Sequence, residues 1–204
     1  MARPKGDIQP RILSAARGRF LADGVDGASL RGIASDAGTS IGMVYYYYPT
    51  KDELFFGVVE ELYRKLLADI ELAITPDVPV KERVERLYGR VARLTEDELL
   101  MAQLVMREAL TSNTRFLRLR ERFKAGHIPL IARLIADGYQ AGIFDPKLHP
   151  MVAMFCVAGV GVLPQIMRRA LDGYLPFPDA PAGEELSKLL VSVLFSGTGA
   201  PAAK

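Results

Sequence analysis

Hydroxyl groups and one cation lie close together between residues 39 and 51 of this chain. Thr39 and Ser40 are followed by four consecutive tyrosines, Tyr45 to Tyr48, and then by Lys51. Alcohol and phenol oxygens beside an ammonium group suit phosphate oxygens or the polar edges of bases. At about 100° per residue on a helix the four tyrosines point in four directions. We therefore expect some of them to pack inward and others to present their hydroxyls to solvent.

The elements that must hold these groups are two short helices joined by a tight turn. Ser29 is a good N-cap, and apolar residues recur after it at helical spacing: Leu30, Ile33, Ala34 and Ala37. Gly38 ends this helix, because glycine adopts the left-handed conformation without steric cost. Thr39 or Ser40 caps a second helix that runs to about Tyr47. Two short helices joined by a turn with glycine match the helix-turn-helix unit, whose second helix lies in the DNA major groove.

The segment resembles the DNA-binding domain of the TetR/AcrR family of bacterial transcriptional regulators. The family pattern is a capped helix ending in Gly, then Val-Ser-x-Gly-x-Leu-Tyr-x-x-Phe-x-x-Lys, and residues 39–51 read TSIGMVYYYYPTK. The departures are mild: Thr39 replaces valine, Val44 replaces leucine and Tyr48 replaces phenylalanine. The first helix also fits, because Ile12, Leu13, Ala16 and Phe20 share one face before the glycines at 24 and 27. Beyond this motif the chain is similar only as a long helical domain.

The resemblance implies roles for individual residues and a partner. Ser40, Ile41, Gly42 and Tyr45 would lie nearest the base edges, and Gly42 would let the backbone approach closely. Phosphates would be held by Ser29, Thr39, Tyr46, Tyr47 and Lys51. The expected partner is double-stranded DNA with a palindromic operator, whose half-sites lie roughly 34 Å or somewhat more apart. The competing interpretation is that the tyrosines only pack within an ordinary buried helix.

Composition fits one small and one larger domain with real cores. Of 204 residues, 50% are apolar and 25% are charged. The net charge is only +2, which argues against a general nucleic-acid coat protein. Residues 1–51 nevertheless hold seven Lys or Arg and four Asp, a net charge of +3, which leaves −1 for the remainder. This bias favours attraction to phosphates, although a chance fluctuation would also explain it.

The chain is expected to be helical nearly throughout, because no strand-like alternation of useful length occurs. The central helices are expected at Lys51–Ala73, Val80–Leu94, Glu96–Leu110 and Thr114–Ala141. The first of these is the expected transmission element between domains, and Pro129 predicts a kink or break near Ala125 and Gly126. The predicted fold class is all-α. An N-terminal three-helix helix-turn-helix DNA-binding domain spans 1–52, a larger helical ligand-binding and dimerisation domain spans 53–197, and a disordered tail spans 198–204.

One apolar run reaches the lower length limit of a membrane span, since residues 150–167 contain no Asp, Glu, Lys, Arg or His. Because Pro164 and Gln165 interrupt it, the sequence predicts a soluble buried helix and no membrane contact. Cys156 is the single cysteine, and the first residues lack the apolar core of a signal peptide, so we expect a cytoplasmic protein.

The resemblance to the TetR/AcrR family implies that the last two long helices form the dimer interface. The apolar run at residues 150–167 is the first of these two helices. Its partner is Glu184–Phe195, which carries an apolar stripe of Leu186, Leu189, Leu190, Val193 and Leu194. We therefore expect a homodimer with a four-helix interface. A monomer would leave one of these stripes without an obvious partner.

A ligand cavity is expected among the middle helices. Met and aromatic residues lie on the three helices that would enclose it: Met101, Met106, Phe123, His127, Met154 and Phe155. Gln103, Arg107 and His127 would orient a ligand if they face inward. The resemblance implies that a small molecule releases the DNA, so we expect a small apolar or amphipathic ligand. The competing interpretation is that these residues fill the core, with Arg107 paired to Glu108 at the surface.

Catalysis is not indicated, and we expect neither an enzyme nor a cofactor. His127 and His149 are the only histidines and lie far apart in sequence. No Gly-rich phosphate loop follows a strand, and no Cys or His pair has the spacing of metal ligands. The alternative to a DNA-binding regulator is an all-helical dimeric ligand-binding or protein-interaction protein. In that case Tyr45 to Tyr48 would form an aromatic partner surface.

Overall fold

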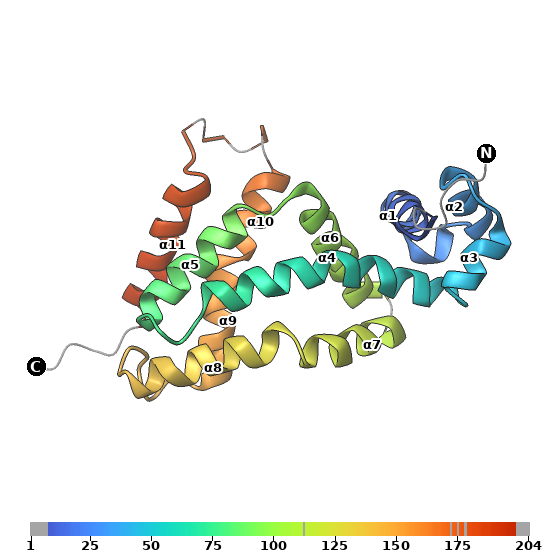
Figure 1. Ribbon diagram of the computed structural model, residues 1–204. Helices are drawn as coiled ribbons and strands as arrows, with labels where there is room; N and C mark the ends of the chain where they lie inside the picture. The colour runs from blue at the N-terminus through green and yellow to red at the C-terminus, as the bar shows by residue number, and fades with distance from the viewer. Residues whose placement is uncertain (1–7, 112, 172, 175, 178, 199–204) are drawn as a thin grey trace, which may run out of the picture. The chain divides into compact units, whose positions relative to one another are not determined.

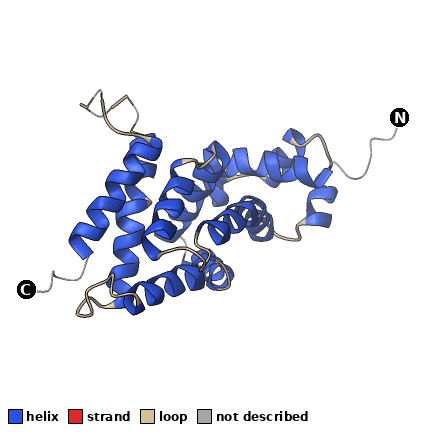
Figure 2. Ribbon diagram, turned by 60° about the vertical axis from the view of Figure 1, so that its left-hand side comes forward, coloured by secondary structure: helices blue, strands red, loops and turns tan. Residues whose placement is uncertain are grey.

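The regular elements of this computed structural model are all helices in the residues that it describes, 8–111, 113–171, 173–174, 176–177 and 179–198 (Figure 2). The prediction of an all-α fold is confirmed. The expected tail at 198–204 lies outside the described residues except for Thr198, which ends the last helix.

The chain forms two compact units, and the first comprises residues 1–66 and 96–121. Its helices are α1 (Ile8–Gly27), α2 (Leu30–Asp36), α3 (Ile41–Tyr47), the first part of α4 (Lys51–Ala73), α6 (Glu96–Thr111) and most of α7 (Asn113–Lys124) (Figure 1). The ring of Phe20 on α1 meets that of Phe55 on α4 edge to face, with centroids 6.0 Å apart. These rings lie in a core that also holds Ile12, Ile33, Val44 and Leu54, all fully buried.

The second unit comprises residues 67–95 and 122–204. It holds the end of α4, α5 (Val80–Ala92), the end of α7, α8 (His127–Gln140), α9 (Pro150–Gly161), α10 (Leu163–Ala170) and α11 (Gly183–Thr198). Helices α5, α9 and α11 lie side by side (Figure 1). The core between them centres on Tyr88, Val157 and Leu194.

The predicted domains, a DNA-binding domain at 1–52 and a ligand-binding and dimerisation domain at 53–197, stay a prediction. Packing alone groups the chain differently, because α6 and most of α7 belong to the same unit as the first three helices. Residues 96–121 therefore belong to the same packed unit as the helix-turn-helix, although they lie far from it in sequence.

Two helix breaks follow the sequence signals. Helix α7 ends at Lys124 and α8 begins at His127, which confirms the break predicted near Ala125 and Gly126. The apolar run divides at Val162, two residues before Pro164, because proline lacks the amide hydrogen that would continue the helix.

A buried polar cluster holds α5, α9, α10 and α11 together. The Tyr88 hydroxyl donates to the Val157 carbonyl at 2.8 Å, and the Tyr88 carbonyl accepts from Gln165 Nε2 at 3.1 Å and from Ser187 Oγ at 3.2 Å. Gln165 Nε2 also donates to the Gly161 carbonyl at 2.6 Å. Desolvation raises the pKa of Tyr88 above its ordinary range, so the phenol stays protonated and donates. Every polar group in this cluster therefore has a partner although it is buried.

The apolar run is less buried than the sequence predicts. Pro150–Ala170 is long and apolar enough to cross a membrane by length and composition alone, and this is weak evidence for a span. Within one chain only 22% of its most apolar window is buried, so the prediction of a buried helix is wrong for a single subunit. The physical reason is that α9 and α10 pack on their own unit along one side only, which leaves Met151, Phe155, Leu163 and Met167 exposed.

Candidate nucleic-acid interface

The turn between α2 and α3 has the capping geometry that the sequence predicts. Ser29 Oγ accepts a hydrogen bond from the Gly32 amide at 3.4 Å, and Ser40 Oγ accepts one from the Met43 amide at 3.3 Å. Each serine thus satisfies one free amide in the first turn of its helix. Gly38 has a φ of 61°, which is the left-handed conformation that ends α2 cheaply. Of the two candidate caps for α3, Ser40 is the one used.

Helix α3 is held by one buried side chain and by the residue that ends it. Val44 is the residue of α3 that is fully buried, and Tyr48 follows the helix with 8% of its surface exposed. The Tyr48 hydroxyl accepts a hydrogen bond from Gln9 Nε2 at 3.1 Å, and burial raises its pKa. A Cβ on Gly57 would lie 2.6 Å from the Tyr48 ring, so this glycine of α4 makes room for the ring.

The other three tyrosines point away from this core to different degrees. Tyr45 is 49% exposed and Tyr46 is 76% exposed, whereas Tyr47 is half-buried. The rings of Tyr46 and Tyr47 contact each other edge to face, with centroids 5.2 Å apart. The prediction that the tyrosines divide between core and surface is confirmed.

The remaining predicted contacts on α3 and its flanks are accessible. Ser40 and Gly42 are exposed, and Thr39 and Ile41 are half-buried. Residues 40–48 contain no charged side chain, so any ionic contact with phosphate must come from outside α3. Ser29 is exposed at the start of α2, although its hydroxyl already accepts the capping hydrogen bond.

Lys51, predicted to hold a phosphate, also has a structural role. Its ammonium donates to the carbonyl oxygens of Asp26 at 2.6 Å and of Ala28 at 3.2 Å. An ammonium has three donors, so two are used at the end of α1 and one is left for an anion. The family motif gave no signal of this contact, because the accepting groups are backbone carbonyls more than twenty residues earlier.

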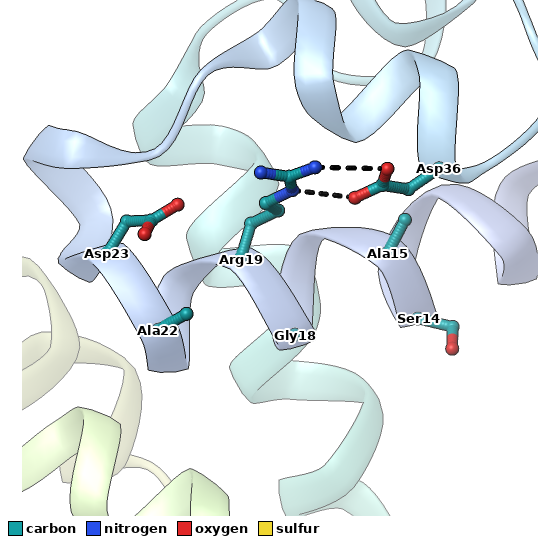
Figure 3. Close-up of a pocket in the computed structure, with 7 residues that line it drawn as sticks. All are labelled: Ser14, Ala15, Gly18, Arg19, Ala22, Asp23 and Asp36. Atoms are coloured by element: carbon teal, nitrogen blue, oxygen red, sulfur yellow. Dashed lines mark hydrogen bonds and ion pairs between the residues drawn. The ribbon is translucent and has the colours of Figure 1, made fainter.

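A shallow hollow of about 330 Å³ lies beside α2 on the surface of α1 (Figure 3). Ser14, Ala15, Gly18 and Ala22 line it together with three charged residues. Arg19 and Asp36 form a two-point ion pair across it, with Nε to Oδ2 at 2.6 Å and Nη2 to Oδ1 at 3.1 Å. The hydrogen bonds from Arg19 lower the pKa of Asp36. The pair ties α2 to α1 and so helps to orient the helix that precedes α3.

The predicted ligand residues are divided between the two units. Met101, Gln103, Met106 and Arg107 belong to the first unit, and His127, Met154 and Phe155 to the second, while the Phe123 side chain lies outside the described residues. Met101 is buried and Met154 packs against the core of its unit, whereas Met106 and Phe155 are exposed. Burial lowers the pKa of His127, which favours a neutral imidazole.

Arg107 and Glu108 do not form the surface pair that the sequence left open as one interpretation. The Arg107 guanidinium lies against Gly24, where a Cβ would come within 2.6 Å of Nη2, and Gly24 has a φ of 75° that breaks α1. Glu108 is instead 3% exposed and pairs with Arg115. In the described part of the chain no group of three or more His, Cys, Asp or Glu residues could hold a metal ion.

Comparisons with known proteins agree with this geometry. The family described as bacterial regulatory proteins, tetR family, matches residues 12–58, which include all of α2 and α3. A transcriptional repressor of the helix-turn-helix type, SCO4008 of Streptomyces coelicolor, is 27% identical over 84% of this chain and 88% of its own length.

Solved structures have a similar fold over nearly the whole chain. A regulatory protein of the tetR family from Rhodococcus RHA1 has a TM-score of 0.73 at 22% identity, over 97% of this chain and 99% of that one. The transcriptional regulator FadR from Bacillus subtilis, solved in complex with stearoyl-CoA, has a TM-score of 0.71 at 18% identity, over 92% and 98%.

Proposed function

Because the chain belongs to the tetR family and is a DNA-binding transcriptional regulator, we propose that it is a homodimeric repressor released from a palindromic operator by a small molecule. Each subunit places α3 in the major groove. Ser40, Ile41, Gly42 and Tyr45 read base edges, and Ser29, Thr39, Tyr46, Tyr47 and Lys51 hold phosphates.

The observation that carries this proposal is the construction of α3. The Ser40 cap and the left-handed Gly38 fix its start, and the buried Val44 and Tyr48 hold it against the core of the first unit. What remains accessible is a run of small and aromatic polar groups, with Ser40 and Gly42 exposed beside Tyr45 and Tyr46. A rigid helix with accessible hydrogen-bonding groups suits recognition of base edges.

The proposed dimer rests on the apolar surface of the second unit. Helices α9 and α11 pack on each other, and exposed apolar side chains lie along α9, α10 and α11: Met151, Val152, Phe155, Leu163, Met167, Leu189 and Val193. An apolar surface of this kind marks an interaction site in a water-soluble regulator. A second copy of the chain would cover it with the same helices, giving a four-helix interface related by twofold symmetry.

The proposed ligand is a small apolar or amphipathic molecule. Its support is the packing of Met154 against the core of the second unit, the neutral state favoured for His127 of the same unit, and the stearoyl-CoA in the complex of the FadR neighbour. The molecule would act by preferring the conformation that does not fit the operator. It would weaken DNA binding by no more than its preference between the two conformations.

The test is a footprint of the purified protein on fragments that include the region upstream of its own gene, at two salt concentrations. Protection of a palindrome that persists at the higher salt supports the repressor. Compounds are then screened for a rise in thermal stability and for loss of that protection, and extraction with mass spectrometry identifies any molecule already bound. If the extracted protein protects no particular sequence at either salt, the all-helical interaction protein replaces this proposal.

A further inference from the structure

Arg115 of α7 joins three acidic residues that come from three different helices of the first unit. Its Nη1 and Nη2 donate to the two carboxylate oxygens of Asp26 at 2.9 and 2.6 Å, and its Nε donates to Glu108 Oε2 at 2.5 Å. Nη1 also reaches Asp52 Oδ1 at 3.3 Å. Asp26 lies at the end of α1, Asp52 at the start of α4 and Glu108 near the end of α6.

A second arginine, one turn along α7, strengthens the attachment to α4. Arg118 pairs with Glu53, lies 3.8 Å from Asp52, and places its guanidinium carbon 4.3 Å from the centroid of the Phe56 ring. A cation over an aromatic face is attracted by the electron density of the ring. The start of α4 is therefore held to α7 by ionic and aromatic contacts together.

Asp26 is held through its backbone as well as its side chain. Its carbonyl accepts from Lys51, its carboxylate accepts from Arg115, and Lys51 also binds the Ala28 carbonyl. The next residue, Ser29, is the N-cap of α2 and one of the proposed phosphate contacts. The corner at residues 26–29 is thus fixed from α4 and from α7 just before the helix-turn-helix begins.

We propose that Arg115 is a positioning residue for DNA binding, which orients the corner at residues 26–29, and with it α2 and α3, by holding Asp26. This inference rests on the proposed function. Arg115 need not touch DNA itself; it connects the DNA-reading helices to α6 and α7, so that they move as one body. Its fork geometry matters, because it grips both Asp26 oxygens while Nε remains on Glu108.

The exposure of the partners makes the link testable without unfolding the protein. The side chains of Arg115 and Glu108 are 10% and 4% exposed, whereas that of Asp26 is 82% exposed. Removing Arg115 alone would leave a buried carboxylate unpaired, which destabilises strongly. Removing Asp26 leaves the buried pair intact, and exposed pairs contribute little to stability. Asp26→Ala therefore separates positioning from folding.

The matched control is Asp23→Ala, which removes the same charge from the same helix. Asp23 is exposed and lines the hollow beside Arg19 (Figure 3). Loss of either negative charge should favour phosphate binding slightly on any DNA. A loss of affinity confined to the operator and to Asp26→Ala therefore cannot come from charge alone.

The experiment measures operator and random-DNA affinity for the wild type and both variants, with amide hydrogen exchange of the free proteins. Asp26→Ala is expected to lose operator affinity on the order of tenfold, to keep its random-DNA affinity, and to exchange faster at the first amides of α2. Asp23→Ala should keep its affinity for both DNAs and its rate of exchange at the first amides of α2. If the wild type selects its operator but the two variants have equal operator affinity and equal exchange, the positioning role of Arg115 is overturned while the proposed function stands.

A double variant tests the same contact by changing Arg115 instead of Asp26. Arg115→Met with Glu108→Met replaces the buried pair by apolar side chains, which such sites tolerate. It should reproduce the operator loss, and adding Asp26→Ala should cause no further loss because the two changes break one link. Additive losses would contradict the link. A wild type that selects no operator would instead refute the proposed function, and this inference with it.

Discussion

The four consecutive tyrosines show how residues of one type take different tasks from their place around a helix. Tyr48 packs beneath α3, and its hydroxyl is used by Gln9. Tyr45 and Tyr46 reach solvent from the same short segment. Tyr45 and Tyr46 are the most exposed of the four tyrosines, so they are the most informative to substitute.

Tyr45→Ala is expected to weaken operator binding by about 1 to 3 kcal/mol, because Tyr45 is proposed to contact base edges. Binding to random DNA should change less. Quantitative gel-shift or fluorescence titrations on both DNAs check this, with Tyr174→Ala as a control from the second unit that removes another highly exposed tyrosine. Unchanged operator affinity in an intact dimer would remove Tyr45 from the interface.

Lys51→Ala should weaken binding to operator and random DNA alike and should flatten the dependence of log K on log salt by about one unit. The reason is the loss of one proposed phosphate contact. Because two backbone hydrogen bonds at Asp26 and Ala28 are lost as well, stability should fall by about 1 kcal/mol. Titrations at several salt concentrations and urea unfolding measure the two effects. A loss restricted to a single operator base would contradict the phosphate role.

Asp26 should titrate below the ordinary aspartate range, because hydrogen bonds from Arg115 lower its pKa. A lowered pKa in the folded state means that the stabilising effect is fully present above the unfolded value of about 3.9 and is lost as the pH falls through the folded pKa. Between pH 5 and 8 this contact should be constant. NMR titration of the Asp26 carboxyl carbon measures the shift, and an ordinary midpoint would show that the ion pair does not form in solution.

At the scale of elements, the starts and ends of helices could be predicted from local sequence signals, whereas side-chain contacts between distant segments could not. Ser29, Gly38 and Ser40 were predictable because a cap or a left-handed glycine acts within three or four residues. The contacts of Lys51 with the carbonyls of Asp26 and Ala28 and of Arg115 with the Asp26 carboxylate were not predictable, since the partners lie 23 or more residues away in sequence. For Arg115, any exposed carboxylate is an equal candidate.

Burial of whole helices was only partly predictable, because it also depends on partners that are distant in sequence or belong to another chain. Periodicity identifies an apolar helix, but it does not say whether the same chain or another chain covers the apolar side. Residues 150–167 were therefore correctly predicted to be helical, but the predicted burial is not reached within one subunit. The break at Val162 followed from Pro164, although its position relative to the proline required the structure.

Gly161→Ala is expected to destabilise the second unit by about 3 kcal/mol or more, because its Cβ would overlap the fully buried Tyr88 ring. Gly159→Ala is the matched control on the same helix, since a Cβ there meets nothing within 4 Å. The control should be neutral or stabilising by up to about 1 kcal/mol through helix propensity. Thermal and urea unfolding compare the two variants, and equal stability would mean that Tyr88 moves aside without cost.

At the scale of the whole molecule, the two proposed surfaces lie in different units. The proposed reading of DNA belongs to α2 and α3 in the first unit, and the proposed self-association belongs to α9, α10 and α11 in the second. Two copies are needed to occupy both halves of a palindrome, so a change far from α3 in sequence should abolish tight binding without altering any DNA contact.

Phe155→Glu is expected to convert the dimer to monomers, because it places a charge in the middle of an apolar interface. Light scattering after size exclusion should report half the mass, and operator affinity should fall by about 100-fold or more as the avidity of two subunits is lost. Leu72→Glu is the control, since Leu72 is 69% exposed on α4 and lies outside the proposed interface. Retention of the dimer by Phe155→Glu would place self-association elsewhere.

The absence of charge from residues 40–48 has a practical consequence for changing the target of this regulator. Ionic attraction to the DNA backbone must come from other segments, so the side chains of α3 that are proposed to read base edges can be exchanged with little effect on how strongly the protein binds non-cognate DNA. Val44 and Tyr48 would be kept to hold the helix in place. A library limited to positions 41, 42 and 45 should therefore yield variants with new operators and an unchanged search rate along the chromosome.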